Sequence, residues 1–289
     1  MTSRRSFLTS SAAGAAALAG SVRALRGNPL GLPIGSQTYP HRKRIQDGDF
    51  AGVCHDLKAL GIGEIELCSP GYEEFASLSD GKKTRRIIED HGLTCPSAHF
   101  DLNELRNKQQ QSIDWAHEIG MTQMGTASLD GKVEDGKTTM DEVKRAADEY
   151  NKIAENAHNA GIQQFLHDET FEMSTVDGRK TYEVLLGLLD PNLVKMQFQM
   201  SAMRAVGDPV MYFNKYPGRF ISMHLQGVNL AGKQENDEEP GQGVAVGHDS
   251  LDWPKIFKAA KTGGVKNYFI EQNWKLTVES AAYLKSLKV

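Results

Sequence analysis

Short apolar runs alternate with longer amphipathic segments along most of the chain. The apolar runs have the length and continuity of strands that are covered on both faces. We expect strands at Ile34–Tyr39, Glu64–Cys68, Leu93–Phe100, Met121–Ala127, the run that begins at Phe165, Val194–Met200, Arg219–Leu225 and Val265–Ile270. The amphipathic segments repeat apolar residues at helical spacing. They predict helices at Phe50–Leu60, Lys83–His91, Gln111–Ile119, Met140–Ala160, Thr181–Leu189, Pro209–Tyr216, Trp253–Ala260 and Val278–Leu287.

Glycines mark most of the points at which a predicted helix ends and a strand follows. Gly61, Gly92, Gly120, Gly161 and Gly264 occupy such positions, where a left-handed C-terminal residue is favoured. Eight strands separated by helices predict an α/β fold, a single (β/α)8 TIM barrel. A doubly wound open sheet is the alternative. It is disfavoured because no Gly-x-Gly-x-x-Gly follows the first predicted strand.

The N-terminus carries a twin-arginine pattern. Arg4 and Arg5 precede a weakly apolar Ala/Gly run from Ala12 to Gly20, which is too short for a membrane span of roughly 20 residues. We expect residues 1–26 to be a twin-arginine signal peptide and residues 27–289 to be the barrel domain. The expected location is periplasmic or otherwise exported, without stable membrane insertion. An Ala-rich surface helix is the alternative reading.

Bulk composition is that of an ordinary globular chain. Hydrophobic residues make up 39% and charged residues 24% of the 289 residues. The net charge of −4 and the pI of about 6.2 give no basic footprint for nucleic acid. The three cysteines, Cys54, Cys68 and Cys95, form neither a disulfide framework nor a closely spaced zinc motif, and we expect buried thiols. The sequence does not determine the oligomeric state.

The densest group of chemically active residues follows the fifth predicted strand. Phe165–Met173 begins with apolar residues and then places His167, Asp168, Glu169 and Glu172 within six positions. Because alternate side chains of a strand share a face, His167 and Glu169 are expected to point the same way. Such groups are costly to bury unless they are paired or bound to a metal. A strand end that leads into a solvated charged loop is the alternative.

Other polar residues lie at the ends of the remaining predicted strands and would surround one mouth of a barrel. They include Tyr39, Glu66, His99, Gln197, Gln199, His224 and Glu271. Glu169, His224 and Glu271 combine carboxylate oxygens with an imidazole, a donor set suited to Mn²⁺, Mg²⁺, Zn²⁺ or Co²⁺. His167 competes with Glu169 for the ligand role. A solvated Glu271 and a hydrogen-bonded core His224 remain the alternatives at those positions.

Several segments together resemble the sugar phosphate isomerase/epimerase family, the xylose isomerase-like TIM barrels. They are the twin-arginine leader, Ile34–Tyr39, Phe165–Met173, Asp208–Arg219, His224, Leu251–Pro254 and Ile270–Gln272. The resemblance covers essentially the whole chain after about Pro33, and its most specific part is Asp208–Arg219 followed by His224. It implies one divalent ion, held by Glu, Asp, His and Glu from the fifth to eighth strands, with a sugar bound over it.

Residue by residue, the resemblance assigns metal-ligand positions to Glu169, Gln199, His224 and Glu271. The fifth-strand motif of the family usually reads Tyr-His-Asn-His-x-x-Glu-Phe, so His167 matches its first histidine and Glu172 its glutamate. Glu169 replaces the second histidine. Gln199 stands where relatives carry a ligand aspartate, and its neutral amide oxygen is a weaker ligand. Either Glu169 restores the missing charge, or the chain binds metal poorly.

The expected function is a metal-dependent sugar or keto-sugar isomerase or epimerase that abstracts a proton next to a carbonyl. The candidate catalytic residues are Glu169, Glu271 and His167. The candidate substrate-binding residues are Tyr39, Glu66, His99, Glu172, Gln197 and Trp253. A 3-keto-glycoside lyase or hydratase and a non-catalytic sugar-binding barrel with a degraded metal site are the alternatives. The expected partner is a small sugar rather than nucleic acid.

Overall fold

The computed structural model describes residues 28–230 and 243–289. The expected signal peptide at residues 1–26 lies outside this part of the chain and stays a prediction. Eight parallel strands close into a barrel in the order β1-β10-β9-β8-β5-β4-β3-β2. This confirms the predicted (β/α)8 fold. No helix in the described ranges is long and apolar enough to cross a membrane.

The strands are short and buried. They are β1 (Gly35–Gln37), β2 (Glu64–Cys68), β3 (Thr94–His99), β4 (Gln123–Thr126), β5 (Gln163–Leu166), β8 (Val194–Gln199), β9 (Phe220–Leu225) and β10 (Asn267–Ile270). Each lies within or overlaps a strand expected from the apolar runs. The strand β5 already ends at Leu166, so His167 and Glu169 lie in the segment that follows it.

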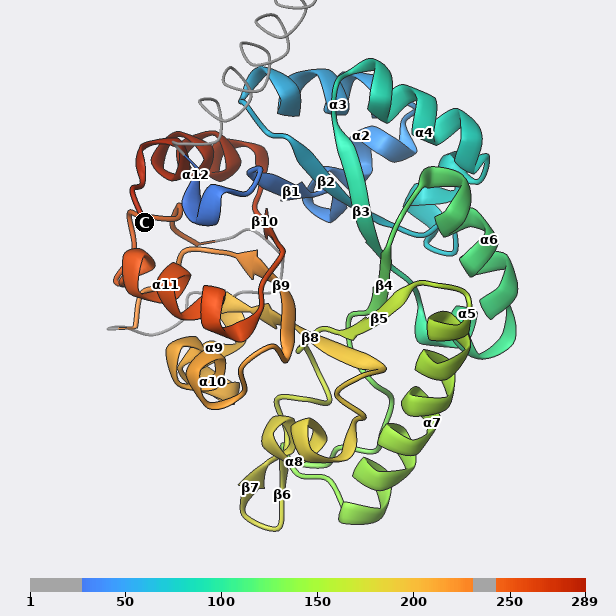
Figure 1. The fold of residues 1–289 in the computed structure, drawn as a ribbon, viewed down its shortest axis with the longest axis vertical. Helices are drawn as coiled ribbons and strands as arrows, with labels where there is room; N and C mark the ends of the chain where they lie inside the picture. Colours follow the sequence, from blue (N-terminus) through green and yellow to red (C-terminus); the bar gives the residue numbers. More distant parts are fainter. Residues whose placement is uncertain (1–27, 231–242) are drawn as a thin grey trace, which may run out of the picture.

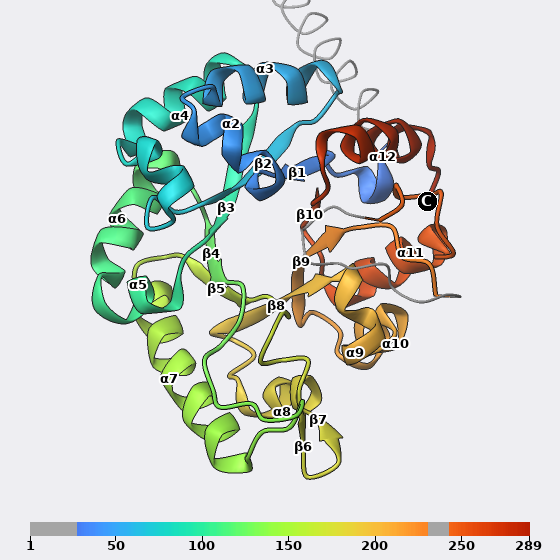
Figure 2. The same ribbon diagram turned by 180° about the vertical axis from the view of Figure 1, so that it is seen from behind.

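The helices surround the strands, as both views of the ribbon show (Figures 1 and 2). They are α2 (Arg42–Gln46), α3 (Phe50–Ala59), α4 (Gly81–Asp90), α5 (Leu102–Asn107), α6 (Gln109–Ile119), α7 (Met140–Asn159), α8 (Thr181–Leu188), α9 (Met203–Val206), α10 (Pro209–Lys215), α11 (Trp253–Gly263) and α12 (Trp274–Ser286). The short helices α2, α5 and α9 were not expected. The hairpin of β6 (Thr175–Val176) and β7 (Arg179–Lys180), which follows Phe165–Met173, was not expected either.

Local sequence explains where many helices begin and end. The side chains of Asp80, Asp101, Thr139 and Asp252 accept hydrogen bonds from backbone N–H groups in the first turns of α4, α5, α7 and α11. These bonds satisfy donors that have no partner inside the helix. Gly120 ends α6 with a φ of 90°, a conformation that glycine adopts without steric cost.

The main hydrophobic core lies between the strands and the surrounding helices. On α7, Val143, Ala146, Tyr150, Ile153 and Ala157 form the buried face, with the spacing of an amphipathic helix. The three cysteines are also buried and free, as expected. Strands and helices thus share the apolar core between them, and most polar side chains of the strands lie on the other side, inside the barrel.

Two phenylalanines enter the barrel interior because glycines on neighbouring strands make room for them. A Cβ atom at Gly125 would lie 2.3 Å from the Phe165 ring, and one at Gly35 would lie 2.5 Å from the Phe269 ring. Phe165 packs near His99, with ring centroids 5.5 Å apart. Phe269 lies 6.2 Å from His224 by the same measure. These rings flank the polar cluster described next.

Candidate active site

Strand register brings polar residues together at the carboxyl ends of the barrel strands. Glu66 pairs with Ser97 across β2 and β3, and Gln199 pairs with His224 across β8 and β9. The register shifts between Glu64 and Glu66 and again just before Gln197. Such irregularities re-aim the side chains next to them. The barrel therefore collects residues that are far apart in sequence into one buried group.

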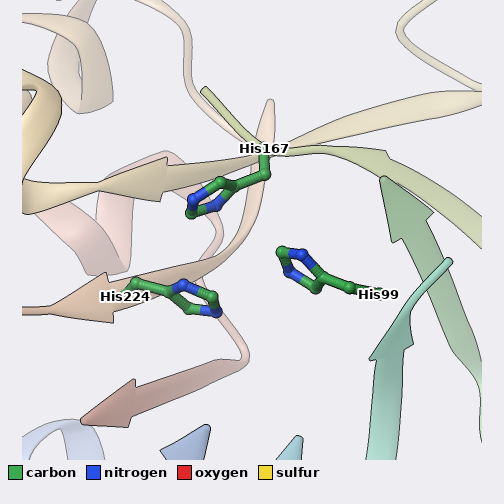
Figure 3. A group of neighbouring side chains, drawn as sticks. All are labelled: His99, His167 and His224. Carbon is green, nitrogen blue, oxygen red and sulfur yellow. The ribbon is translucent and has the colours of Figure 1, made fainter. Parts of the chain in front are cut away.

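Three imidazoles form the centre of this group: His99 at the end of β3, His167 just after β5, and His224 on β9. One potential ligand atom from each lies within 4.8 Å of the others. Ring centroids are 5.1 Å apart for His99 and His167, 5.2 Å for His99 and His224, and 4.6 Å for His167 and His224. Figure 3 shows the three rings pointing toward one another from separate segments. All three side chains are buried.

Glu66 is the carboxylate at the base of the imidazole group and is fully buried. Its Oε1 lies 2.5 Å from His224 Nε2 and 3.3 Å from His99 Nε2. Its Oε2 accepts hydrogen bonds from Ser97 Oγ at 2.6 Å and Gln197 Nε2 at 2.9 Å. Burial alone would raise the pKa of this carboxyl, but the two histidines hold the pKa well below its usual range. Glu66 is therefore ionised.

Glu271, directly after β10, is the second buried carboxylate of the cluster. Its Oε2 accepts hydrogen bonds from Gln199 Nε2 at 2.7 Å and Gln226 Nε2 at 3.0 Å, and it lies 3.2 Å from His224 Nδ1. Burial opposes ionisation, yet the charge of His224 and these hydrogen bonds lower the pKa of Glu271. The mouth thus contains two fixed negative charges on opposite sides of one imidazole.

His224 connects the two carboxylates. Burial would lower the pKa of its ring, but Glu271 and Glu66 outweigh burial and raise the pKa to about 10. The ring is therefore protonated when no other cation compensates the glutamates. His99 is held by Gln197, whose Oε1 lies 2.7 Å from His99 Nε2.

His167 and Gln199 carry polar atoms that the described protein does not satisfy. Both ring nitrogens of His167 and the Oε1 atom of Gln199 are buried without a hydrogen-bond partner. Burial, together with the neighbouring rings of His224 and His99, holds the pKa of His167 well below its usual range, so its ring is neutral. Neutral imidazole nitrogens and amide oxygens are metal ligands. Because these atoms converge with two carboxylates, the residues present fit a divalent cation.

Glu169 lies at the rim of the cluster. Its Oε1 is 3.8 Å from His167 Nε2, and 43% of its side chain is exposed. Desolvation of the carboxyl group and the charge of Glu271 raise its pKa. No hydrogen bond within the described residues restrains this carboxyl group. Glu169 therefore differs from Glu66 and Glu271 in being solvent-accessible and closer to protonation at neutral pH.

The structure brings most of the predicted site residues into this cluster: Glu66, His99, His167, Glu169, Gln197, Gln199, His224 and Glu271. The three others make contacts with different neighbours. Tyr39 lies after β1 beneath Arg42, whose guanidinium carbon is 4.3 Å from the ring centroid. Glu172 is buried and binds Ser128 Oγ at 2.6 Å and Leu129 N at 2.8 Å. Trp253 is fully buried at the start of α11, and its indole N–H donates to Asp249.

Two members of the cluster, Ser97 and Ser222, were not selected from the sequence, and the contacts of two others, Gln226 and Asp168, were not expected. Ser97 and Ser222 hydrogen-bond Glu66 and Gln197 inside the barrel, and Gln226 donates to Glu271. Asp168 accepts the backbone N–H of Gln199 at 2.6 Å and so connects the two segments. The serines precede His99 and His224 by two positions, and this alternation would have placed them on the same face.

Known structures share this architecture. A sugar phosphate isomerase/epimerase from Parabacteroides distasonis superimposes with a TM-score of 0.69 and 21% identity, covering 88% of this chain and 94% of that chain. An L-ribulose 3-epimerase has a TM-score of 0.67 and 14% identity, with coverage of 88% and 94%. A xylose isomerase-like TIM barrel protein from Mycobacterium smegmatis in complex with magnesium has a TM-score of 0.62 and 15% identity, with coverage of 88% and 95%.

No family model and no curated protein matches the chain. At these sequence identities the structural likeness defines the fold: this chain is a xylose isomerase-like TIM barrel. Function must be argued from the site, because one barrel fold supports many chemistries.

Proposed function

We propose that this protein is a metal-dependent sugar or keto-sugar isomerase or epimerase of the sugar phosphate isomerase/epimerase family. The observation that carries the proposal is the convergence of three imidazoles and the carboxylates of Glu66 and Glu271 at the carboxyl ends of the barrel strands. In TIM barrels this end is where active sites lie. Two structural neighbours, the L-ribulose 3-epimerase and a D-allulose 3-epimerase solved in complex with D-allulose, support a sugar as the substrate.

The reaction requires removal of a proton from a carbon next to a carbonyl group. We assign this step to Glu169, because its accessible carboxyl group has a raised pKa and is free of protein hydrogen bonds in the described structure. A base works best when its pKa approaches the working pH. Glu271 is the second candidate. Its low pKa and its hydrogen bonds to Gln199 and Gln226 suit it better to holding a fixed negative charge.

A divalent ion at this mouth would polarise carbonyl and hydroxyl oxygens and stabilise the negative charge that develops on them. The cluster offers two ligand sets, and His224 belongs to both. One is the set implied by the family: Glu169, Gln199, His224 and Glu271. The other is the group of three imidazoles. The candidate ions are Mn²⁺, Zn²⁺, Co²⁺ and Mg²⁺. The magnesium complex of one neighbour supports a divalent ion.

The proposed substrate is a free sugar or keto-sugar rather than a sugar phosphate. The twin-arginine pattern at Arg4 and Arg5 supports export, and phosphorylated sugars are mainly cytoplasmic. The sequence also lacks a glycine-rich phosphate cradle. We propose a periplasmic or otherwise exported location for the protein on the same ground.

Solvent-exchange NMR tests the proposal directly. Ketoses, aldoses and 3-keto-glycosides are incubated with the protein in D₂O, with Mn²⁺, Zn²⁺, Co²⁺ or Mg²⁺ added in turn. Deuterium incorporation next to the carbonyl together with a new isomer or epimer is expected. Loss of the aglycone would instead identify the lyase or hydratase. Sugar binding without any exchange, unaffected by chelators, would contradict the enzyme and leave the sugar-binding barrel.

A further inference from the structure

Three members of the ligand set implied by the family, Gln199, His224 and Glu271, are joined to one another through a single oxygen of Glu271. Gln199 directs its NH₂ group, not its oxygen, at Glu271 Oε2. The same oxygen also faces Gln226 Nε2 and His224 Nδ1. These contacts place three protein nitrogens on Oε2 of Glu271 and fix that side of the carboxylate within the protein. Glu169, the remaining member, lies at the half-exposed rim.

The three imidazoles offer a different set of metal ligands, and all of them are buried, unlike Glu169. One ring nitrogen each from His99, His167 and His224 lies within 4.8 Å of the others, and both ring nitrogens of His167 are buried without a hydrogen-bond partner among the described residues. A buried polar atom without a partner is costly, and native structures rarely keep one unless something else binds it. An ion between the three rings would satisfy one ring nitrogen of His167.

Glu66 supplies a carboxylate oxygen to the same place. Its Oε1 faces the Nε2 atoms of both His224, at 2.5 Å, and His99, at 3.3 Å. Ligand atoms bound tetrahedrally to zinc at 2.0–2.1 Å are separated by roughly 3.3 Å. The His99–Glu66 separation already has this value, and the shorter His224–Glu66 contact needs to open by less than an ångström.

We propose that the divalent ion of this protein is bound by His99, His167, His224 and Glu66, and not by the carboxylate-rich set implied by the family. The ligands come from β3, the segment after β5, β9 and β2. This assignment rests on the proposed function for the expectation of a divalent ion. It leaves Glu169 free to move the proton.

The donor set determines the metal. Three imidazoles and one carboxylate favour Zn²⁺ or Co²⁺, whereas Mg²⁺ prefers sites made of oxygen atoms. The surrounding residues fit such a site. Glu271 would keep its contact with Nδ1 of His224 while Nε2 binds the ion. This carboxylate–histidine–metal arrangement fixes the orientation of the ring and increases its basicity. Gln197 and Ser97 hold the other oxygen of Glu66.

Metal analysis of the full-length protein with matched variants tests the ligand set. His167→Asn is the central variant, because in the described part of the chain neither ring nitrogen of His167 makes a hydrogen bond that the substitution would break. His99→Asn removes a second proposed ligand. Glu169→Gln removes a ligand of the family set alone. His117→Asn, at an exposed position on α6, is the control for histidine substitution.

We expect near-stoichiometric zinc in the wild-type protein, in Glu169→Gln and in His117→Asn, and loss of zinc in His167→Asn and His99→Asn. Metal that survives in both ligand variants but disappears in Glu169→Gln would overturn the assignment and leave the proposed function standing. A wild-type protein that binds none of Zn²⁺, Co²⁺, Mn²⁺ and Mg²⁺ would overturn both.

Cobalt spectroscopy gives a readout that does not depend on whether the variants fold. Four-coordinate Co²⁺ with imidazole ligands absorbs strongly in the visible range, whereas six-coordinate Co²⁺ with oxygen ligands absorbs weakly. We expect the intense spectrum in the wild-type protein, and the weak spectrum would contradict the assignment. Zinc bound at the imidazoles in a protein that exchanges no sugar proton would contradict the proposed function alone.

Discussion

The Nε2 atom of His224 lies 2.5 Å from Oε1 of Glu66, although 158 positions separate the two residues in the chain. The pair joins β9 to β2 across the barrel interior, and neither side chain is exposed to solvent. Its charge balance depends on Glu271, which contacts the other ring nitrogen. Two ionised carboxylates around one imidazolium leave a net negative charge in a buried place, which suits a site for a cation.

Replacing Glu66 by alanine should strongly destabilise the metal-free protein. The substitution leaves the charged His224 ring with one carboxylate fewer and removes the acceptor of Ser97 and Gln197. Breaking a buried ion pair in this way costs about 3–5 kcal/mol. Urea unfolding in the presence of a chelator measures the change. Glu73→Ala, at an exposed position in the segment that follows β2, is the control. A loss below about 1 kcal/mol for Glu66→Ala would contradict the pairing.

Replacing Glu169 by glutamine should lower kcat by about 100- to 10,000-fold, the usual contribution of a general base. The neutral amide has nearly the same shape but cannot accept the substrate proton. Initial rates on the substrate identified by NMR provide the measurement, with Glu155→Gln on the exposed face of α7 as the control. An unchanged kcat would transfer the role of base to Glu271.

Glu172 should make stability depend on pH. Burial, opposed by hydrogen bonds from Ser128 and Leu129, raises the pKa of this carboxyl to about 7 in the folded protein, above its value in the unfolded chain. The protonated form therefore stabilises the fold at low pH, and this contribution is lost as pH rises from about 4.5 through about 7. Its full size is on the order of 3 kcal/mol.

The variant Glu172→Gln should remove that dependence. Urea unfolding at several pH values between 4 and 8 compares the two proteins. The free energy of unfolding of the wild-type protein should fall relative to the variant across this range. Parallel curves for the two proteins would show that Glu172 does not titrate in the folded state.

Gly125 should tolerate no side chain. A Cβ atom there would lie 2.3 Å from the Phe165 ring and 2.6 Å from the Phe165 carbonyl oxygen. Overpacking of this kind typically costs about 1–3 kcal/mol, so Gly125→Ala should lower the thermal midpoint. Gly187→Ala is the matched control in α8, where, among the described residues, no atom outside the chain neighbours and the helix's own backbone lies within 4 Å of the added carbon. It should stabilise the protein by about 0.5–1 kcal/mol, and an equal effect of both substitutions would contradict the packing argument.

The polar residues near the strand ends could be predicted from the sequence, because they stand in or next to short apolar runs. Glu66, His99, Gln199, His224 and Glu271 were found in this way. What each of them contacts was not readable. Gln199 occupies a position implied for a metal ligand, yet its amide donates to Glu271. Glu172 was expected among the substrate-binding residues, yet it holds the loop at Ser128 and Leu129. In both cases the partner lies on a strand or loop that is more than 40 positions away in the chain.

The sequence by itself determined the alternation of strands and helices, the closed barrel that follows from it, and the end of the barrel at which polar side chains gather. These properties depend on local periodicity and on the parallel direction of successive strands. Only the tertiary structure decided that His99, His167 and His224 face one another over Glu66. That arrangement depends on strand register, on the shifts before Glu66 and Gln197, and on the space that Gly35 and Gly125 leave for Phe269 and Phe165. Contacts across a closed barrel join residues about a hundred or more positions apart, and no local pattern in the chain encodes them.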